Sequence, residues 1–347
     1  MKRSSILALP IALAFLAAPL PAPAPAAAQT VTLKLHHFVP PVAPPHATFL
    51  APWAAKVEKE SGGRIKIQIY PSMQLGGSPA QMVDQIKDGV VDIGWTLPGY
   101  TAGRFPKTEI IEMPFLHTTA LATTLALQDY AEKHLRDEYK DYHVLLLHAH
   151  GGTLVHASKG ITKLEDYKGL KVRTPNRAGS VFLRAVGASP VGAPVPEVPQ
   201  MLSKGVIDGA LLPYEIARPL KVHELVKYHS EFAGPQPRIG TSVFLFAMNK
   251  KSYESLPADL KKVIDANSGR HIAEWAGRNW DEIEKPGKEA AEKAGNHFPI
   301  MPVAEVERVR AAVRPEMDKF LKELAGTGFD AQALYAEAQA LVKKYAK

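Results

Sequence analysis

Cysteine is absent from the chain of 347 residues. Its absence excludes disulfide bonds, zinc–thiolate sites, cysteine nucleophiles and a lipid anchor attached through cysteine. The sequence also lacks the G-x-S-x-G, H-E-x-x-H, G-x-G-x-x-G and Walker signatures of common hydrolases, metalloproteases and nucleotide-binding proteins. The run Gly76-Gly77-Ser78 is too short to form a phosphate-binding loop. No catalytic residues are therefore expected, and an enzyme is disfavoured.

Positive charge is only slightly in excess. The chain has 42 Lys and Arg residues against 35 Asp and Glu residues, which gives a net charge of +7. The basic residues are dispersed and cluster only in pairs such as Lys250-Lys251 and Lys261-Lys262. Nucleic-acid binding requires a basic patch, so no nucleic-acid partner is expected. With 46% hydrophobic and 22% charged residues, the composition is that of an ordinary globular protein.

A hydrophobic run long enough to cross a membrane is also missing. The positive start Met1-Lys2-Arg3 is followed by an apolar run of about eleven residues at 6–16 and by a Pro/Ala-rich stretch that ends in three alanines. A membrane-spanning helix needs ~20 apolar residues. The pattern therefore predicts a cleaved signal peptide over residues 1–28 rather than a membrane anchor, and export to the periplasm.

Alternating and helical hydrophobic patterns then follow one another along the chain. The first set predicts strands at 31–38, 65–70 and 90–95, with helices at 47–61 and 79–88. The second set predicts strands at 142–148, 154–157, 170–173, 206–212 and 241–248, a turn or short helix at 163–169, and helices at 180–186 and 196–203. Two strand–helix sets in succession predict an α/β protein with two lobes.

Helical patterns dominate the remainder of the chain. They predict helices at 258–294, with an interruption at Pro286-Gly287, and at 303–324 and 331–345. No internal repeat of fixed short period is present.

Several motifs in fixed order carry a resemblance to a known family. Residues 166–176 read D-Y-K-G-L-K-V-R-T-P-N, residues 183–191 read L-R-A-V-G-A-S-P-V, and residues 198–213 read V-P-Q-M-L-S-K-G-V-I-D-G-A-L-L-P. Residues 70–76, Y-P-S-M-Q-L-G, and the strand-N-K pattern at 244–257 agree as well. Over essentially the whole chain after the leader, the sequence resembles the DctP-type substrate-binding proteins of TRAP transporters, the tripartite ATP-independent periplasmic carriers.

This resemblance implies an architecture and a role. It implies a two-lobed periplasmic binding protein fold with crossing strands, a long C-terminal hinge helix and a ligand cleft between the lobes. We expect lobe I to comprise 29–149 plus about 239–279, and lobe II 150–238 plus about 280–347. The expected role is to capture a small organic carboxylate and deliver it to TRAP membrane subunits, as a monomer and without a cofactor.

Arg173 is the first candidate for the ligand site. In the resembled family the arginine of K-[IV]-R-x-P binds the ligand carboxylate, and guanidinium pairs bidentately with carboxylates. Arg173 also ends a predicted strand, where open α/β sheets place ligands. The alternative is a surface arginine in an ion pair.

Further candidates follow the ends of other predicted strands. They are Asn176, Trp95, Tyr100, Tyr214, Gln74 and His37. Each has a structural alternative, such as a turn residue for Asn176 or core packing for Trp95. Phe105 and Phe115 are also possible wall residues. If these aromatics line the cleft, the ligand has an apolar or aromatic body.

Three residue patterns that are absent further restrict which ligands and bound ions we expect. A second arginine found in sialic-acid-binding relatives is replaced by Gly152-Thr153-Leu154. No acidic–aromatic pair directly follows Asp208-Gly209, which argues against a bound cation. The pairs His36-His37 and His148/His150 lack further ligands at a recognisable spacing, so no metal site is expected.

Two other functions remain open at this stage. A ligand sensor that presents its bound state to a membrane receptor would have the same fold and the same site. An exported enzyme would need a catalytic set that the sequence does not show. The identity of the carboxylate is likewise left open by the sequence.

Overall fold

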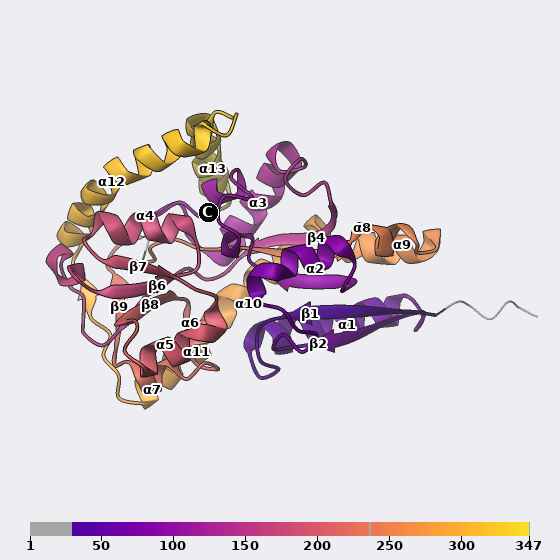
Figure 1. Cartoon of the computed structure of the whole chain (residues 1–347), viewed down its shortest axis with the longest axis horizontal. Coiled ribbons are helices and arrows are strands. Elements are labelled where there is room, and N and C mark those ends of the chain that lie inside the picture. Colours follow the sequence, from indigo (N-terminus) through magenta and orange to yellow (C-terminus); the bar gives the residue numbers. More distant parts are fainter. Residues whose placement is uncertain (1–29, 236, 347) are drawn as a thin grey trace, which may run out of the picture.

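The computed structural model describes residues 30–235 and 237–346, and it confirms a mixed α/β fold with two sheets (Figure 1). The signal peptide expected at 1–28 lies outside the described residues. Figure 1 shows the two sheets in separate lobes along the longest axis, with a helix between them. Within the described ranges, no helix combines the length and the apolarity needed to cross a membrane.

The first lobe is built on a five-stranded sheet in the order β2-β1-β3-β10-β4. Its strands are β1 Val31–His37, β2 Ile65–Tyr70, β3 Ile93–Thr96, β4 Tyr142–Ala149 and β10 Val243–Asn249. β1 is parallel to β2 and β3, whereas β10 is antiparallel to β3 and β4. A strand from late in the chain therefore completes the first sheet, which ties the lobe together over a long sequence separation.

The second lobe is built on a six-stranded sheet in the order β11-β9-β5-β8-β6-β7. Its strands are β5 Leu154–Ala157, β6 Lys171–Thr174, β7 Ser189–Gly192, β8 Gly209–Leu212, β9 Tyr228–Phe232 and β11 Ile300–Met301. β6 is parallel to both of its neighbours, β7 and β8. The carboxyl ends of β6 and β8 consequently lie at one edge, the edge at which α/β sheets bind ligands.

Helices cover both sheets. Their bounds are α1 Ala51–Glu60, α2 Met82–Asp88, α3 Ala120–His134, α4 Arg177–Ala185, α5 Val198–Ser203, α6 Tyr214–Ala217, α7 Val222–Leu225, α8 Lys250–Glu254, α9 Ala258–Ala266, α10 Arg270–Glu282, α11 Glu284–Lys293, α12 Val303–Ala325 and α13 Ala331–Tyr345. A π-helical turn, Pro45–Leu50, leads into α1. Short 3₁₀ turns precede α2 and α5.

The chain crosses between the lobes at several places. The segments after β4 and after β9 run side by side, and Thr153 pairs with Gly240 in an isolated antiparallel bridge. The Thr153 N–H donates to the Gly240 carbonyl oxygen at 2.8 Å, and the Ile239 N–H donates to the Thr153 carbonyl oxygen at 2.9 Å. The α10–α11 pair makes a further crossing, since α10 packs on α3 of the first lobe and α11 on α6 of the second.

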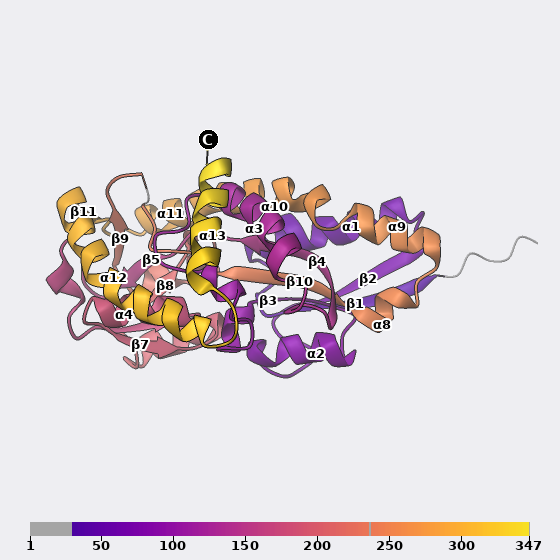
Figure 2. The ribbon, with the colours of Figure 1, turned by 90° about the horizontal axis from the view of Figure 1, so that it is seen from above.

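The long helix expected near the C-terminus is present as α12, which packs on α4 of the second lobe. Figure 2 shows α12 leading back from the far end of that lobe and α13 lying beside α3. The assignment of 280–347 to lobe II does not account for this contact of α13 with the first lobe. The proposed lobe boundaries themselves stay a prediction.

Large aromatic side chains fill the core of the first lobe. Phe49 packs edge-on against Trp280 at 5.1 Å, and Trp53 against Phe246 at 4.7 Å, measured between ring centroids. All four residues are fully buried. The Trp53 indole Nε1–H donates to the Asn267 carbonyl oxygen at 2.8 Å. The polar end of this indole is thereby satisfied while its rings are buried.

Some expected element boundaries are wrong. The helix predicted over 258–294 breaks at 267–269 and at 283 rather than at Pro286-Gly287. Pro286 lies in the first turn of α11, where a missing N–H costs no helical hydrogen bond. A Cβ at Gly287 would approach the Tyr214 carbonyl oxygen to 2.1 Å, so this glycine permits close packing of α11 on α6.

Two other differences concern strand β3 and helix α3. Strand β3 begins at Ile93 rather than at residue 90, and just before it the Asp92 carboxylate accepts the Lys34 N–H at 2.9 Å. Helix α3 was not predicted at all. It is in contact with α10, α13 and β4, so its apolar residues are spread around the helix and give no single hydrophobic stripe.

Candidate functional site

A cavity of about 390 Å³ lies between the two lobes. The first sheet and its loops contribute mostly aromatic and aliphatic side chains, the second lobe contributes the charged groups, and the crossing segments contribute His150, Thr153 and Ser242. The lining residues are Phe38, Val39, Pro45, Trp95, Leu97, Tyr100, His150, Thr153, Arg173, Pro175, Val195, Leu211, Leu212, Pro213, Glu215, Ile216, Ser242 and Phe244.

Arg173 enters this cavity from the carboxyl-terminal half of β6 and is 2% exposed. Its Nε donates to the Ala193 carbonyl oxygen at 2.8 Å, and its Nη1 donates to the Leu211 carbonyl oxygen at 3.2 Å. Its Nη2 is buried and has no hydrogen-bond partner within the described residues. The guanidinium is thus held in place by two backbone carbonyls while one of its nitrogens remains unsatisfied.

Burial makes this cation costly. Desolvation lowers the pKa of Arg173, and the nearby phenol of Tyr100 opposes that shift. The Tyr100 hydroxyl also accepts the Val195 N–H at 3.1 Å, and burial raises the pKa of Tyr100. No acidic side chain in the described ranges lies within ion-pair distance of Arg173, although the charge of the more distant Glu197 also opposes the shift in its pKa. A buried, uncompensated guanidinium favours an anionic group in the cavity.

Stacked aromatic rings form one wall of the cavity. Trp95 stacks between Phe38, at 5.2 Å, and Phe244, at 4.5 Å between ring centroids. Tyr100 meets Phe38 edge-on at 5.8 Å. The Trp95 Nε1–H donates to His148 Nε2 at 2.9 Å, which fixes the indole plane. These side chains give the cavity an apolar, aromatic wall suited to an aromatic ligand body.

Glu215 is the acidic residue of the lining, and it is 2% exposed at the start of α6. Burial and the neighbouring carboxylate of Glu284 raise the pKa of Glu215 far above its ordinary range. His150 is also buried, and desolvation lowers its pKa well below the ordinary value. Both side chains are therefore neutral at physiological pH, and Arg173 is the charged group of the lining.

A smaller cavity of about 270 Å³ adjoins the first and shares Thr153, Pro175, Leu211 and Ser242 with it. Glu112 lines this second cavity and accepts the Val243 N–H through Oε1 at 2.9 Å. Burial raises the pKa of Glu112 to about 8.

The other residues predicted for the site lie at different distances from it. Asn176 lines the smaller cavity and one further pocket rather than the larger cavity, and its Oδ1 accepts the Gly179 N–H at 2.8 Å and caps α4. Tyr214 is buried beside Glu215 but donates its hydroxyl to Glu231 at 3.1 Å, away from the lining. Gln74 is exposed, and neither cavity includes it.

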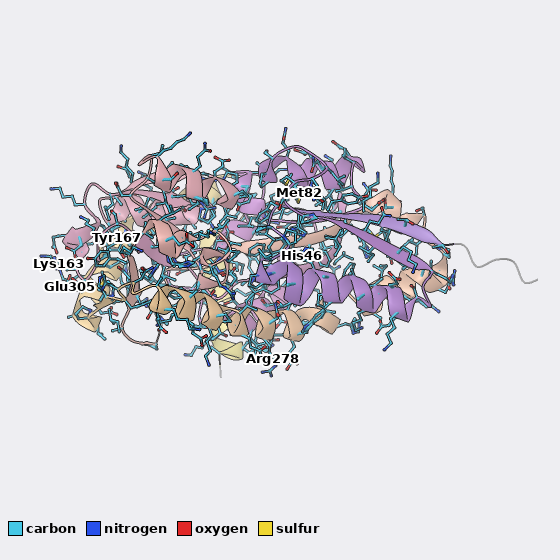
Figure 3. All side chains as sticks on the ribbon, turned by 90° about the horizontal axis from the view of Figure 1, so that it is seen from below. His46, Met82, Lys163, Tyr167, Arg278 and Glu305 are labelled. Carbon is cyan, nitrogen blue, oxygen red and sulfur yellow. The ribbon has the colours of Figure 1, made fainter. Side chains whose placement is uncertain are left out.

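His37 is fully buried next to the wall rather than in it. Its Nε2 is 2.8 Å from His46 Nδ1, and burial lowers the pKa of His37 to about 3. Figure 3 shows His46 in the first lobe, well apart from Lys163, Tyr167 and Glu305 at the far end of the second lobe. Of the seven predicted residues, Arg173, Trp95 and Tyr100 are brought together in the larger cavity.

Sequence reasoning missed several lining residues. Phe38 directly follows β1, Phe244 lies in β10, and Glu215 follows β8 by three residues. A position just past a strand end was the available signal for Phe38 and Glu215. Phe105 and Phe115, considered as wall residues, lie outside the lining, and Phe105 stacks on Tyr139 at 5.1 Å instead.

The histidine pairs occupy structural positions. His148 accepts from Trp95 and contacts the Ala149 carbonyl oxygen through Nδ1 at 3.2 Å. Across the part of the chain that the structure describes, no three His, Asp or Glu side chains are grouped as a metal site would require.

Comparison with known proteins gives a consistent result. The family model for bacterial extracellular solute-binding proteins, family 7, matches residues 35–324. A TRAP solute-binding protein from Rhodoferax ferrireducens, solved with copurified benzoate, is 45% identical with a TM-score of 0.89, and the alignment covers 91% of this chain and 98% of that one.

Two further solved structures are similar. A marine metagenome TRAP solute-binding protein specific for aromatic acids, solved with 3-hydroxybenzoate, is 43% identical with a TM-score of 0.90 over 92% of this chain and 100% of that one. A TRAP periplasmic solute-binding protein from Bordetella bronchiseptica, solved with (R)- and (S)-mandelate, is 29% identical with a TM-score of 0.83 over 90% of this chain and 99% of that one.

Proposed function

Since the chain belongs to the bacterial extracellular solute-binding proteins of family 7, we propose that it captures an aromatic monocarboxylate between its lobes. The members of this family are solute-binding proteins rather than enzymes. The observation that carries the proposal is the buried guanidinium of Arg173, whose Nη2 has no partner in the described chain while Nε and Nη1 are fixed by backbone carbonyls. A ligand carboxylate in the cavity supplies the missing anion and acceptor.

The aromatic body of the ligand follows from the wall of the cavity. Trp95, Phe38 and Phe244 present stacked rings, and Tyr100 meets them edge-on. Aromatic groups gain from such offset and edge-on packing beyond their buried area. Relatives that are 45% and 43% identical were solved with benzoate and 3-hydroxybenzoate, which supports the same ligand class here.

We infer that the ligand carries one carboxylate, because the lining carries one cation. Arg173 is the charged residue, because Glu215 and His150 are neutral. A second carboxylate would enter the cavity without a cation, at a large desolvation cost.

The proposal includes the cellular location of the protein and its membrane partner. We infer that residues 1–28 direct export to the periplasm, and that the loaded protein delivers its ligand as a monomer to TRAP membrane subunits. Relatives named as TRAP periplasmic solute-binding proteins support this setting.

Thermal unfolding with a panel of carboxylates tests the function. The protein lacking residues 1–28 is unfolded, dialysed and refolded to remove copurified ligand, and is then screened with benzoate, phenylacetate, mandelate, phthalate, succinate and pyruvate. A ligand that binds only the folded state at 100 times its Kd adds about 2.7 kcal/mol of stability. Aromatic monocarboxylates are expected to raise Tm, and a panel in which aliphatic dicarboxylates alone raise Tm would contradict the proposal.

Substitution of Arg173 tests the site within that function. Arg173→Ala removes the buried cation and is expected to weaken binding by about 3–5 kcal/mol, roughly 100- to several-thousand-fold in Kd. Arg173→Lys keeps the charge but loses the fork of donors, so it should weaken binding less. Titration calorimetry measures both. The matched control is Arg184→Ala, an exposed arginine on α4, and near-normal affinity in a folded Arg173→Ala protein would refute the assignment.

A further inference from the structure

Two of the residues that line the larger cavity carry a buried polar atom without a partner in the described chain. They are Arg173, through Nη2, and Glu215, through Oε2. Nη2 of Arg173 would donate to the carboxylate of the proposed ligand. Oε2 of Glu215 is a polar atom that an entirely apolar ligand body would leave unsatisfied, which costs about 1–3 kcal/mol for a buried group.

The other polar groups of the lining each make at least one hydrogen bond within the described chain. The Tyr100 hydroxyl accepts the Val195 N–H, and the Thr153 hydroxyl donates to the Gly240 carbonyl oxygen at 3.3 Å. The Ser242 hydroxyl accepts from Asn176 at 3.3 Å, and His150 Nε2 lies 3.2 Å from the Ser242 N–H. Glu215 differs from them, because its buried Oε2 has no hydrogen-bond partner in the described chain.

The protonation of Glu215 is set by a second buried carboxyl group, Glu284 at the start of α11. Glu284 accepts the Glu215 N–H through Oε1 at 3.0 Å and the Tyr214 N–H through Oε2 at 3.2 Å. Burial raises the pKa of Glu284, and this shift is opposed by hydrogen bonds with Glu215 and by the charge of Arg238. Because two adjacent buried carboxyls cannot both ionise cheaply, burial, the charge of Glu284 and a hydrogen bond between the two side chains raise the pKa of Glu215 well above its ordinary value. That hydrogen bond uses one oxygen of Glu215 and leaves the other for a group in the cavity.

Glu215 and Arg173 come from different elements, so they can contact different parts of the ligand. Arg173 belongs to β6 and is held by the carbonyls of Ala193 and Leu211, whereas Glu215 belongs to α6 and is held beside Glu284. Neither side chain is hydrogen-bonded to the other in the described chain, although both line one cavity. One group can therefore bind a carboxylate while the other meets a substituent elsewhere on the ring.

We propose that Glu215 is a specificity-determining residue, and that its carboxyl group binds a hydroxyl substituent on the body of the ligand. The inference rests on the proposed function, and it deepens it: the preferred ligand is a hydroxylated aromatic monocarboxylate. A neutral carboxyl can exchange a hydrogen bond with a hydroxyl, and it does so without adding a charge to the cavity.

Calorimetric titration of the wild-type protein gives the first test. The probes are benzoate, the three monohydroxybenzoates and the three corresponding methoxybenzoates. At least one hydroxybenzoate is expected to bind about 3- to 30-fold more tightly than benzoate, as one buried hydrogen bond implies. Its methoxy counterpart, which cannot donate and is larger, should lose that advantage. If benzoate binds through Arg173 but no hydroxybenzoate is preferred, the role of Glu215 is refuted and the proposed function stands.

Two substitutions at Glu215 give the second test, measured as the ratio of hydroxybenzoate affinity to benzoate affinity. Glu215→Gln keeps a neutral group of the same shape and is expected to hold the ratio within about threefold. Glu215→Leu removes both polar atoms and is expected to bring the ratio close to 1. Glu254→Leu, at an exposed position on α8, is the control.

The outcomes separate the two claims. An unchanged ratio in Glu215→Leu would overturn the specificity role, and so would a ratio lost in Glu215→Gln as fully as in Glu215→Leu. If Glu215→Leu does not fold, Glu215→Gln and the methoxy series still decide. Failure of every aromatic carboxylate to bind wild type would instead overturn the proposed function, and the inference with it.

Discussion

At the level of single residues, several buried ionisable groups hold protonation states that differ from those in water. Burial lowers the pKa of His148 to about 3 and of His117 to about 4, so both are neutral in the folded protein. Burial raises the pKa of Glu112 to about 8, so this acid keeps its proton. These groups make the stability of the fold depend on pH in opposite directions.

Glu112 gives a residue-level prediction about stability and pH. Its pKa is about 8 in the folded chain against an ordinary value near 4.5, so the folded state binds more protons between these values. The contribution of Glu112 to the free energy of unfolding is therefore fully present below pH 4.5. It is lost as the pH rises toward 8, by up to about 1.4 kcal/mol per pH unit. Urea denaturation of Glu112→Gln from pH 5 to 8.5 should show a shallower loss of stability than wild type.

The control for that measurement is Glu254→Gln, because Glu254 is exposed. It should reproduce the wild-type pH dependence. Parallel pH profiles for wild type and Glu112→Gln would show that Glu112 is not protonated in the folded protein.

Trp95 gives a second residue-level prediction. Of the four tryptophans in the chain, Trp95 lines the cavity, and Trp275 lies half-buried on α10. An aromatic ligand stacked near Trp95 is expected to change the intrinsic fluorescence. Trp95→Phe should abolish most of that change, whereas Trp275→Phe should retain it. Equal changes in both variants would place the ligand away from the aromatic wall.

At the level of elements, α10 is the helix on which the first lobe and its crossing to the second both depend. It packs on α3 and β4, and it carries Trp280 into the aromatic core. Gly277 allows the close approach, because a Cβ at this position would come within 2.6 Å of the Leu121 Cα. Backbone atoms cannot move aside as the end of a flexible side chain can.

Gly277→Ala is accordingly predicted to destabilise the protein despite the better helix propensity of alanine. Overpacking costs about 1–3 kcal/mol, against roughly 1 kcal/mol gained in propensity. The matched control is Gly192→Ala, since a Cβ at Gly192 meets nothing within 4 Å and the position needs no positive φ. Chemical denaturation measures both variants, and equal stabilities would show that α3 and α10 separate without cost.

The crossing segments are the other elements that matter for function. Gly151 and Gly152 connect β4 to β5, and a Cβ at Gly151 would lie 2.5 Å from Glu284 Cγ. Gly152 also has φ of +93°, which favours glycine. These glycines bring the first crossing segment against the start of α11, next to the carboxyl pair of Glu215 and Glu284.

At the level of the whole molecule, the cavity is shared between two lobes that are joined by a few narrow connections. Its walls come from both sheets, so a bound ligand links the lobes directly. Hinge closure around ligands is a common motion in such proteins. The bridge between Thr153 and Gly240 and the α10–α11 connection are the places where such a motion would be accommodated.

Small-angle X-ray scattering provides the whole-molecule prediction. Saturation with the tightest-binding aromatic carboxylate should lower the radius of gyration of the refolded, ligand-free protein. Arg173→Ala, measured at the same ligand concentration, should show no such change. A ligand that binds fully without altering the radius of gyration would show that the cavity fills without movement of the lobes.

Much of the fold was predictable because its signals are local. Strand β2 alternates its side chains, and β6 ends at a Thr-Pro turn, so each was placed within a residue of its observed bounds. Helix α3 escaped prediction because three neighbours bury it from several sides. The break expected at Pro286-Gly287 was misplaced because a proline in the first turn of a helix is tolerated.

The motif around Arg173 and the order of the strands were sufficient to predict the family, the carboxylate ligand and the two-lobed class, since each depends on short stretches of neighbouring residues. The composition of the cavity depends on residues that lie far apart in the chain, such as Phe38, Trp95, Glu215 and Phe244. Whether Arg173 lacks an acidic partner, and whether Glu215 keeps its proton beside Glu284, is decided by burial and distance, because these arise only when the chain has folded.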